Sequence, residues 1–259
     1  MSTVNDPGPV WGPLQEEMVE ALTVLPTDVP GVVETLEQLQ GILKRLPPVE
    51  QRNPVAVFNT LYTKVTKCVL HDLRRKQFKN PEFMAKLDVE FAERYLVALR
   101  RFTGMDQSAP TPVAWTTLFD RRGDRALRPI PAAVVGVNAH VNFDLTFALL
   151  TALGDVRPRR RSPEHKDYLH INKIFRKEIP KLRDEFETDL ARLVDRLCGT
   201  LDDALQSRLV ILTRGLAWRR AQSLWPERDD LATTQDVEDG MDRRAALFGR
   251  CVLRLRWLQ

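Results

Sequence analysis

Residues 131–150 read PAAVVGVNAHVNFDLTFALL, an almost continuously apolar run with four polar side chains near its middle, Asn138, His140, Asn142 and Asp144. A helix that is apolar on every side has no face for solvent. Other elements must therefore surround it, and its polar groups need internal partners. We predict a buried central helix over about 131–153.

Two of these polar residues, His140 and Asp144, lie one helical turn apart. Positions four apart share a helix face, so the pair lies on one stripe, and the asparagines share the opposite side. Gly136, one turn earlier, is expected to leave space beside the imidazole. The two side chains could simply hydrogen-bond to each other inside the core and have no catalytic role. The attraction within a buried ion pair usually only offsets the free energy of removing both charges from water, however. Stability alone is therefore a weak reason for this pair. We favour an acid/base pair facing a cavity, because a carboxylate-bound imidazole can transfer protons near neutral pH.

Composition limits the function classes. The chain has 259 residues, enough for one large core, and a formal net charge of +4. This mild excess argues against a dedicated nucleic-acid binder. Cys68, Cys198 and Cys251 are far apart and odd in number, which indicates reduced core thiols of a cytoplasmic protein. No basic segment precedes an apolar run at the N-terminus, and polar residues interrupt the longest apolar stretches. Neither secretion nor membrane spanning is expected.

Helical periodicity extends over most of the chain. Apolar residues recur at spacings of three and four, and no segment shows sustained alternation or a hairpin turn. Asn53-Pro54, Asn80-Pro81 and Ser162-Pro163 each predict a helix start, with an N-cap followed by proline at the first helical position. The expected helices cover about 32–46, 54–73, 81–103, 113–119, 131–153, from 163 onward, 186–197, 202–225 and 241–258. The fold class is all-α, a single-domain bundle of about eight helices over 31–259. Residues 1–30 are expected to form an irregular arm and 226–240 an acidic loop.

Several polar and aromatic residues share stripes with the apolar faces of neighbouring helices, where the wall of a pocket would lie. We expect these residues to bind a substrate beside the catalytic pair His140 and Asp144. Tyr168 and Asn172 point inward with Phe175 and are candidates to meet that pair. The predicted substrate-binding residues are Asn59, Tyr62, Trp115, Phe147, Tyr168, Asn172, Arg214 and Trp218.

Two arginine-rich loops flank the central helix, at 121–128 and 157–161. Cations after a helix C-terminus are favourable, which explains the second loop. Cations before an N-terminus are not, so the first loop indicates either solvated arginines or contact with an anionic ligand or acidic protein.

The segment Gly136–Leu145 resembles the Asn-Ala-His-hydrophobic-Asn-x-Asp-Leu signature of a bacterial family of unknown function. The further pairs of that family occur in the same order in this chain, so the likeness extends over about residues 55–225. They are Leu61-Tyr62, Val65-Thr66, Phe91-Ala92, Arg94-Tyr95, Trp115 with Phe119, Asp167-Tyr168 with Asn172, Ala217-Trp218 and Leu224-Trp225. The chain is also similar to the small spiroacetal cyclases of bacterial polyketide pathways. That resemblance implies cyclisation of a dihydroxyketone with loss of water.

Three functions follow as hypotheses. The first, which we favour, is a cyclase or dehydratase of specialised metabolism that acts on a small molecule by acid/base chemistry, without cofactor or metal. The second is a metal-dependent hydrolase, such as a phosphoesterase, in which His140 and Asp144 are ligands; a catalytic site needs at least three. The third is a non-catalytic binding module whose arginine loops dock an acidic partner. The sequence does not determine the oligomeric state, and a homodimer is one option. Further metal ligands in the second hypothesis would come from Glu90, Asp120, His165 or Asp167.

Overall fold

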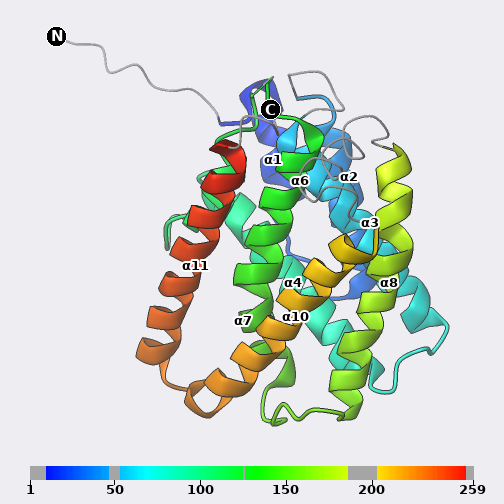
Figure 1. The fold of residues 1–259 in the computed structure, drawn as a ribbon. Helices are drawn as coiled ribbons and strands as arrows, with labels where there is room; N and C mark the ends of the chain where they lie inside the picture. The colour runs from blue at the N-terminus through cyan, green and yellow to red at the C-terminus, as the bar shows by residue number, and fades with distance from the viewer. Residues whose placement is uncertain (1–9, 47–52, 125, 186–202, 255–259) are drawn as a thin grey trace.

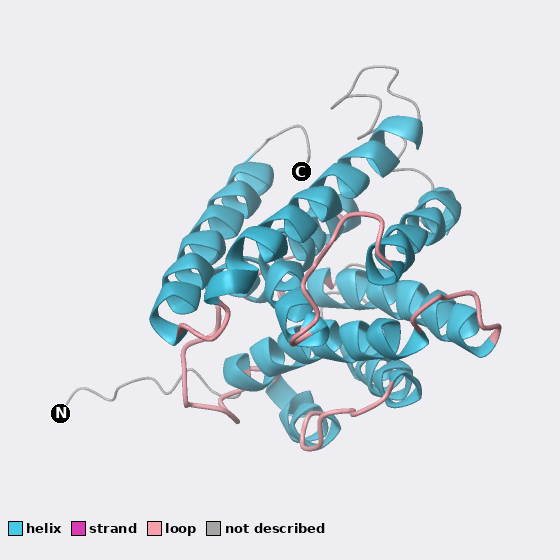
Figure 2. Cartoon of the chain, turned by 90° about the horizontal axis from the view of Figure 1, so that it is seen from below, coloured by secondary structure: helices cyan, strands magenta, loops and turns pink. Residues whose placement is uncertain are grey.

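The structure is a computed structural model, and it describes residues 10–46, 53–124, 126–185 and 203–254. These residues form helices joined by loops, and no strand occurs among them (Figures 1 and 2). The all-α prediction is confirmed. The helix expected at 186–197 and Cys198 lie outside the described residues. The outer helices are α1 (Gln15–Ala21), α2 (Val29–Leu43), α3 (Pro54–Arg74), α4 (Pro81–Phe102), α5 (Val113–Phe119), α8 (Pro163–Glu185), α10 (Asp203–Leu224) and α11 (Leu231–Arg254).

The apolar segment forms one continuous column at the centre of the bundle (Figure 1). It consists of α6 (Pro129–Val137), the π-helical segment η2 (Asn138–Asp144) and α7 (Leu145–Leu153). α3 packs on α6, α4 and α10 pack on α7, and α11 packs on both α6 and η2. Pro131–Leu153 is long and apolar enough to cross a membrane, but 78% of its most apolar window is buried inside the protein. The prediction of a buried central helix is confirmed.

The predicted helix starts follow from local hydrogen bonding. The Asn53 side-chain oxygen accepts from the backbone N–H groups of Val55 and Ala56 at the start of α3. Asn80 and Ser162 accept in the same way from residues three positions later, in α4 and α8. Each cap satisfies a donor that the first helical turn leaves unpaired, and proline follows because it has no N–H to lose.

Residues 10–30, the described part of the predicted irregular arm, are more regular than we expected. The amphipathic part of this segment forms α1, and Trp11 and Met18 are almost completely buried in the common core. Arg122, from the first arginine loop, donates to the carbonyl of Val10 at 2.7 Å and lies over the rings of Trp11 and Phe102. This arginine is therefore partly buried, and it ties the N-terminal segment to the rest of the bundle.

The predicted acidic loop at 226–240 is also wrong over most of its length, because α11 begins at Leu231. Asp230 caps it. Its carboxylate accepts from the N–H groups of Ala232 and Thr233 and from the Thr233 hydroxyl. The apolar stripe of α11 becomes dense only from Met241, so its first turns are polar on most sides and carry little helical periodicity.

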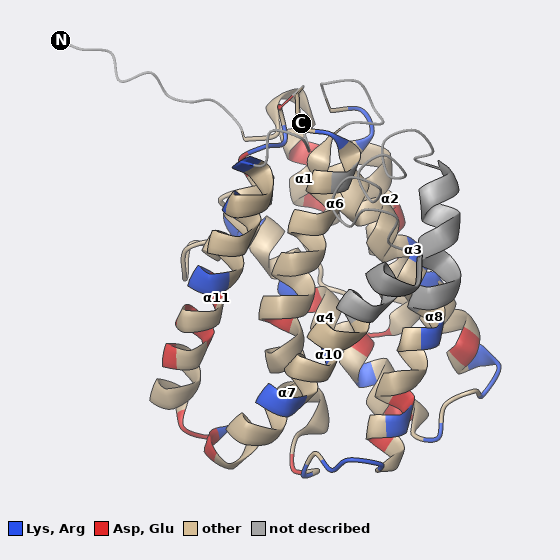
Figure 3. Ribbon diagram, in the orientation of Figure 1, with Lys and Arg blue, Asp and Glu red and all other residues tan. Residues whose placement is uncertain are grey.

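The cysteines and the second arginine loop differ in how far they are exposed. Cys68 is partly buried, but Cys251 is exposed, so the prediction of a core thiol is wrong for the latter. The second arginine loop, between α7 and α8, lies at one end of the bundle (Figure 3), and Arg157, Arg159, Arg160 and Arg161 are exposed there.

Candidate functional site

The centre of the site is a π-helical turn in the middle of the apolar column. The N–H of Leu145 donates to the carbonyl of His140, five residues earlier, which widens the helix at this point. The Asn138 amide donates to the carbonyl of Ala245 in α11 at 2.8 Å, and Asn142 donates to Asn138 at 3.0 Å. The first bond holds the widened turn against α11, and the second joins the two asparagines within the turn. Single π turns inside α-helices are frequent at functional sites.

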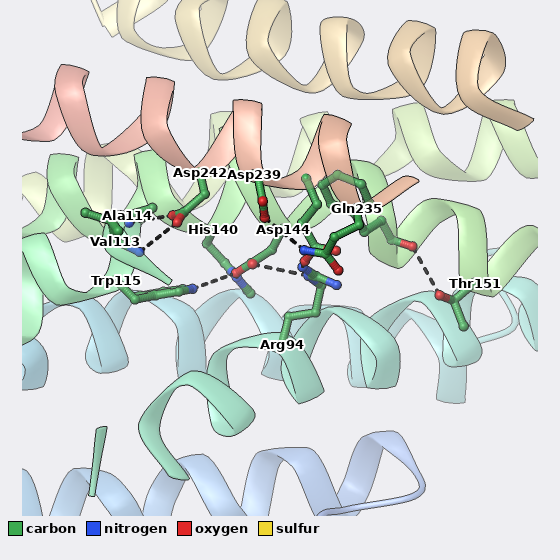
Figure 4. Close-up of polar contacts among 12 residues, drawn as sticks. Arg94, Val113, Ala114, Trp115, His140, Asp144, Thr151, Gln235, Asp239 and Asp242 are labelled. Carbon is green, nitrogen blue, oxygen red and sulfur yellow. Dashed lines mark hydrogen bonds and ion pairs between the residues drawn. The ribbon is translucent and has the colours of Figure 1, made fainter. Parts of the chain in front are cut away.

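His140 and Asp144 form a buried pair in this turn (Figure 4). Nδ1 of His140 lies 3.0 Å from Oδ2 of Asp144, and both side chains are at most 3% exposed. A carboxylate only accepts hydrogen bonds, so Nδ1 carries the proton and the lone pair of a neutral ring lies on Nε2. Nε2 is buried and has no hydrogen-bond partner among the residues that the structure describes.

The Asp144 carboxylate accepts two further bonds. The indole N–H of Trp115 donates to Oδ2 at 2.9 Å, and Nε of Arg94 donates to Oδ1 at 3.2 Å. Arg94 also pairs with Glu238 of α11. The carboxylate is thus held from three sides (Figure 4), which fixes the direction in which it orients the imidazole.

Burial sets the charge states of this group. It lowers the pKa of His140, and the bond to Asp144 offsets this only in part, so the ring is neutral near pH 7. Burial also acts to lower the pKa of Arg94, but Asp144 and Glu238 outweigh it and raise that pKa. The result is a neutral imidazole beside a fixed carboxylate and guanidinium.

Aromatic rings enclose the imidazole. Phe91 stacks on it with a centroid distance of 3.4 Å and an interplanar angle of 9°, and Tyr62 meets it edge-on at 4.5 Å. Phe58 also meets it edge-on, at 5.6 Å. Gly136 does not leave open space, contrary to our expectation. A Cβ there would lie 2.5 Å from the Phe58 ring, so the glycine admits that ring.

A cavity of about 60 Å³ adjoins the imidazole. Most of its wall is apolar, and three lining side chains, Leu61, Phe91 and Val137, are only partly buried. Its polar or titratable lining residues are Tyr62, Asp88, His140 and Arg214. Burial raises the pKa of the Tyr62 phenol well above its usual value, and Asp88 raises it further, while a weak contact with Thr66 lowers it. The phenol is therefore un-ionised.

The predicted substrate-binding residues lie in three places: beside the His140–Asp144 pair, between α3 and α2, and between α8 and α10. Tyr62 and Trp115 lie beside the pair, and Phe147 lies under the Arg94 guanidinium at 5.0 Å. Asn59 instead donates to the carbonyl of Leu36 and to Gln40, where it ties α3 to α2.

Tyr168 and Asn172 do not meet His140, contrary to the prediction, because they bind Arg214. Nε of Arg214 donates to Asn172 at 2.9 Å, and the Tyr168 hydroxyl donates to the Arg214 carbonyl at 2.7 Å. Trp218 packs on Tyr168 at 5.2 Å. This second cluster joins α8 to α10, and of its members only Arg214 lines the cavity.

The further metal ligands named in the hydrolase hypothesis, Glu90, Asp120, His165 and Asp167, do not gather around the pair. Asp167 accepts from the backbone N–H groups of Lys79 and Asn80, whereas Asp120 is exposed. Within the described ranges, no three His, Cys, Asp or Glu side chains are arranged to hold a metal ion.

Sequence reasoning missed Arg94 and Asp88. A buried carboxylate such as Asp144 usually needs a cationic partner. Arg94 was among the residues that carried the family resemblance, but nothing in the local pattern of α4 connects Arg94 to Asp144. Asp88 lies on the apolar stripe of Met84, Leu87 and Phe91, and a carboxyl group on such a stripe was the available signal.

A model of a family of unknown function (DUF5995) matches residues 30–255. The chain belongs to this family. The match includes the whole π turn, the aromatic enclosure and the cavity lining of this DUF5995 protein. No curated protein and no solved structure matches the chain. The family description carries no activity.

Proposed function

We propose that this DUF5995 protein is an acid/base enzyme that acts without a cofactor on a small neutral molecule carrying hydroxyl and carbonyl oxygens. One observation carries the proposal: a buried imidazole whose Nδ1 is fixed by a carboxylate adjoins a cavity, and its Nε2 has no partner within the described part of the chain. A buried polar group without a hydrogen bond costs about 1–3 kcal/mol. A ligand oxygen that donates to Nε2 would offset this cost.

The arrangement supports removal of a proton from a hydroxyl group. Neutral His140 accepts the proton at Nε2, and Asp144 stabilises the imidazolium that forms. Arg94 and Trp115 keep the carboxylate oriented. A positioned base of this kind contributes on the order of 10²–10⁴ in rate.

The cavity limits the part of the substrate that can lie beside the imidazole. Typical small-molecule pockets are about 300–1,000 Å³, whereas this cavity is about 60 Å³. We infer that it takes only the reacting oxygens and a few carbons. Within these limits, closure of a hydroxyketone to a cyclic hemiacetal, the first step of spiroacetal formation, is the reaction that we propose. We further propose that the enzyme acts in the cytoplasm.

The metal-dependent alternative has less support. The Arg94 guanidinium binds one Asp144 oxygen and the Trp115 N–H binds the other, so a cation would compete with a fixed positive charge. The proposal therefore keeps His140 and Asp144 as proton-transfer groups.

The test uses 5-hydroxypentan-2-one, which closes reversibly to its hemiacetal. The rate of interconversion is measured by NMR magnetisation transfer, with the same concentration of free imidazole as reference. We expect the protein to accelerate closure and His140→Gln to remove the acceleration. His165→Gln, a partly buried histidine outside the cavity, is the matched control and should keep it. A wild-type rate equal to that of imidazole would contradict the proposal and favour a binding module.

A further inference from the structure

Asp88 is a polar residue of the cavity wall with no part in the proton transfer described so far. It lies on α4, its side chain is buried, and its Oδ2 finds no hydrogen-bond partner in the described ranges. The cavity that it lines is the one beside His140. The Tyr62 hydroxyl on the same wall is likewise without a hydrogen-bond partner among the described residues. Asp88 and His140 border this small space from different helices, each with such an unpartnered atom.

The two groups are complementary in proton content. Burial raises the pKa of Asp88 to about 8, so at neutral pH it holds a proton that it can donate. His140 is neutral and can accept one. The other titratable or charged lining groups are the un-ionised phenol of Tyr62 on α3 and the guanidinium of Arg214 on α10, which binds Asn172 and Tyr168. An acid and a base on one cavity are typical of bifunctional proton transfer.

From the shared cavity and the two unpartnered atoms, we infer that Asp88 is the catalytic proton donor that works opposite His140 and protonates the carbonyl oxygen of the substrate. This inference rests on the proposed function, and it names the second catalytic residue of that site.

Each proton and electron pair in the resulting ring closure passes between the substrate and these two residues. His140 Nε2 takes the proton of the attacking hydroxyl, the new C–O bond forms, and the carbonyl π pair moves to its oxygen, which takes the proton of Asp88. The pair ends as imidazolium and carboxylate. In a second closure the imidazolium protonates the hemiacetal hydroxyl, which leaves as water. The second hydroxyl then adds, and its proton goes to Asp88. Two closures therefore restore both residues, with one water lost.

The experiment measures closure of 5-hydroxypentan-2-one by wild type, Asp88→Asn and Asp167→Asn. The asparagine amide can still donate a hydrogen bond but cannot supply a proton, so we expect Asp88→Asn to lose about 10²-fold or more in rate. Asp167 is another buried aspartate and lies outside the cavity, so its variant should lose much less. The pH profile separates catalysis from structure. The wild-type rate should fall as pH rises through about 8, where Asp88 gives up its proton, and this alkaline limb should be absent in Asp88→Asn.

The outcomes separate the two proposals. If His140→Gln is inactive but Asp88→Asn keeps the wild-type rate and alkaline limb, Asp88 is not the donor and the acid/base function stands. If wild type does not accelerate closure, both are overturned. An equal loss in Asp167→Asn would assign the Asp88 effect to packing.

Discussion

The protonation state of Asp88 can be measured through folding stability, without any substrate. In the folded protein burial raises the pKa of this carboxyl to about 8, whereas an aspartate in an unfolded chain has a pKa of about 3.9. Between these values the folded state holds a proton that the unfolded state has released. Stability from this group is therefore fully present below about pH 4 and is lost as pH rises toward 8.

Asp88→Asn removes this dependence, because the amide is neutral in both states. From pH 5 to pH 7 the wild type should lose about 2.6 kcal/mol of unfolding free energy relative to the variant, since the slope is close to 1.36 kcal/mol per pH unit for one proton. The lowered pKa of His140 acts in the opposite direction, with stability lost as pH falls through about 6.5, but it is common to both proteins and cancels in the difference.

The assay is urea unfolding at half-unit steps from pH 4 to pH 8, followed by circular dichroism. Equal slopes of free energy against urea concentration in the two proteins would show that the same surface is exposed on unfolding. A difference between them that stays constant from pH 5 to pH 7 would show that Asp88 is ionised in the folded protein. That result would refute both the buried acid and its proposed role as proton donor.

Two further predictions concern the imidazole and its surroundings. Gly136→Ala should cost about 1–3 kcal/mol in urea unfolding because its Cβ would overlap the Phe58 ring. Gly240→Ala, inside α11 with open space around it, should instead raise the free energy of unfolding by about 0.5–1 kcal/mol. Equal effects of the two substitutions would show that the Phe58 ring moves aside without cost. In NMR titrations the His140 ring should protonate below the usual histidine pKa. In Asp144→Asn it should protonate at still lower pH, because the carboxylate contact that raises its pKa is gone; a rise in that variant would mean that Asp144 does not act on the ring as described.

The sequence by itself determined the elements whose causes are local. Continuous apolar character predicts the central helix, and the Asn-Pro and Ser-Pro pairs fix the starts of α3, α4 and α8, because capping bonds join residues two or three positions apart. The His140–Asp144 contact is of the same kind, since it spans one turn of one helix.

Only the tertiary structure decided what surrounds that pair. Arg94 and Trp115 reach Asp144 from helices distant in sequence, and Asp88 shares a cavity with His140 through the packing of α4 against the column. Tyr168 and Asn172 point inward as predicted but meet Arg214, because helical periodicity gives the direction of a side chain and not the neighbour that it faces. The size of the cavity is likewise set by how rings such as Phe58 fill space against Gly136, a consequence of packing in three dimensions that no local pattern encodes.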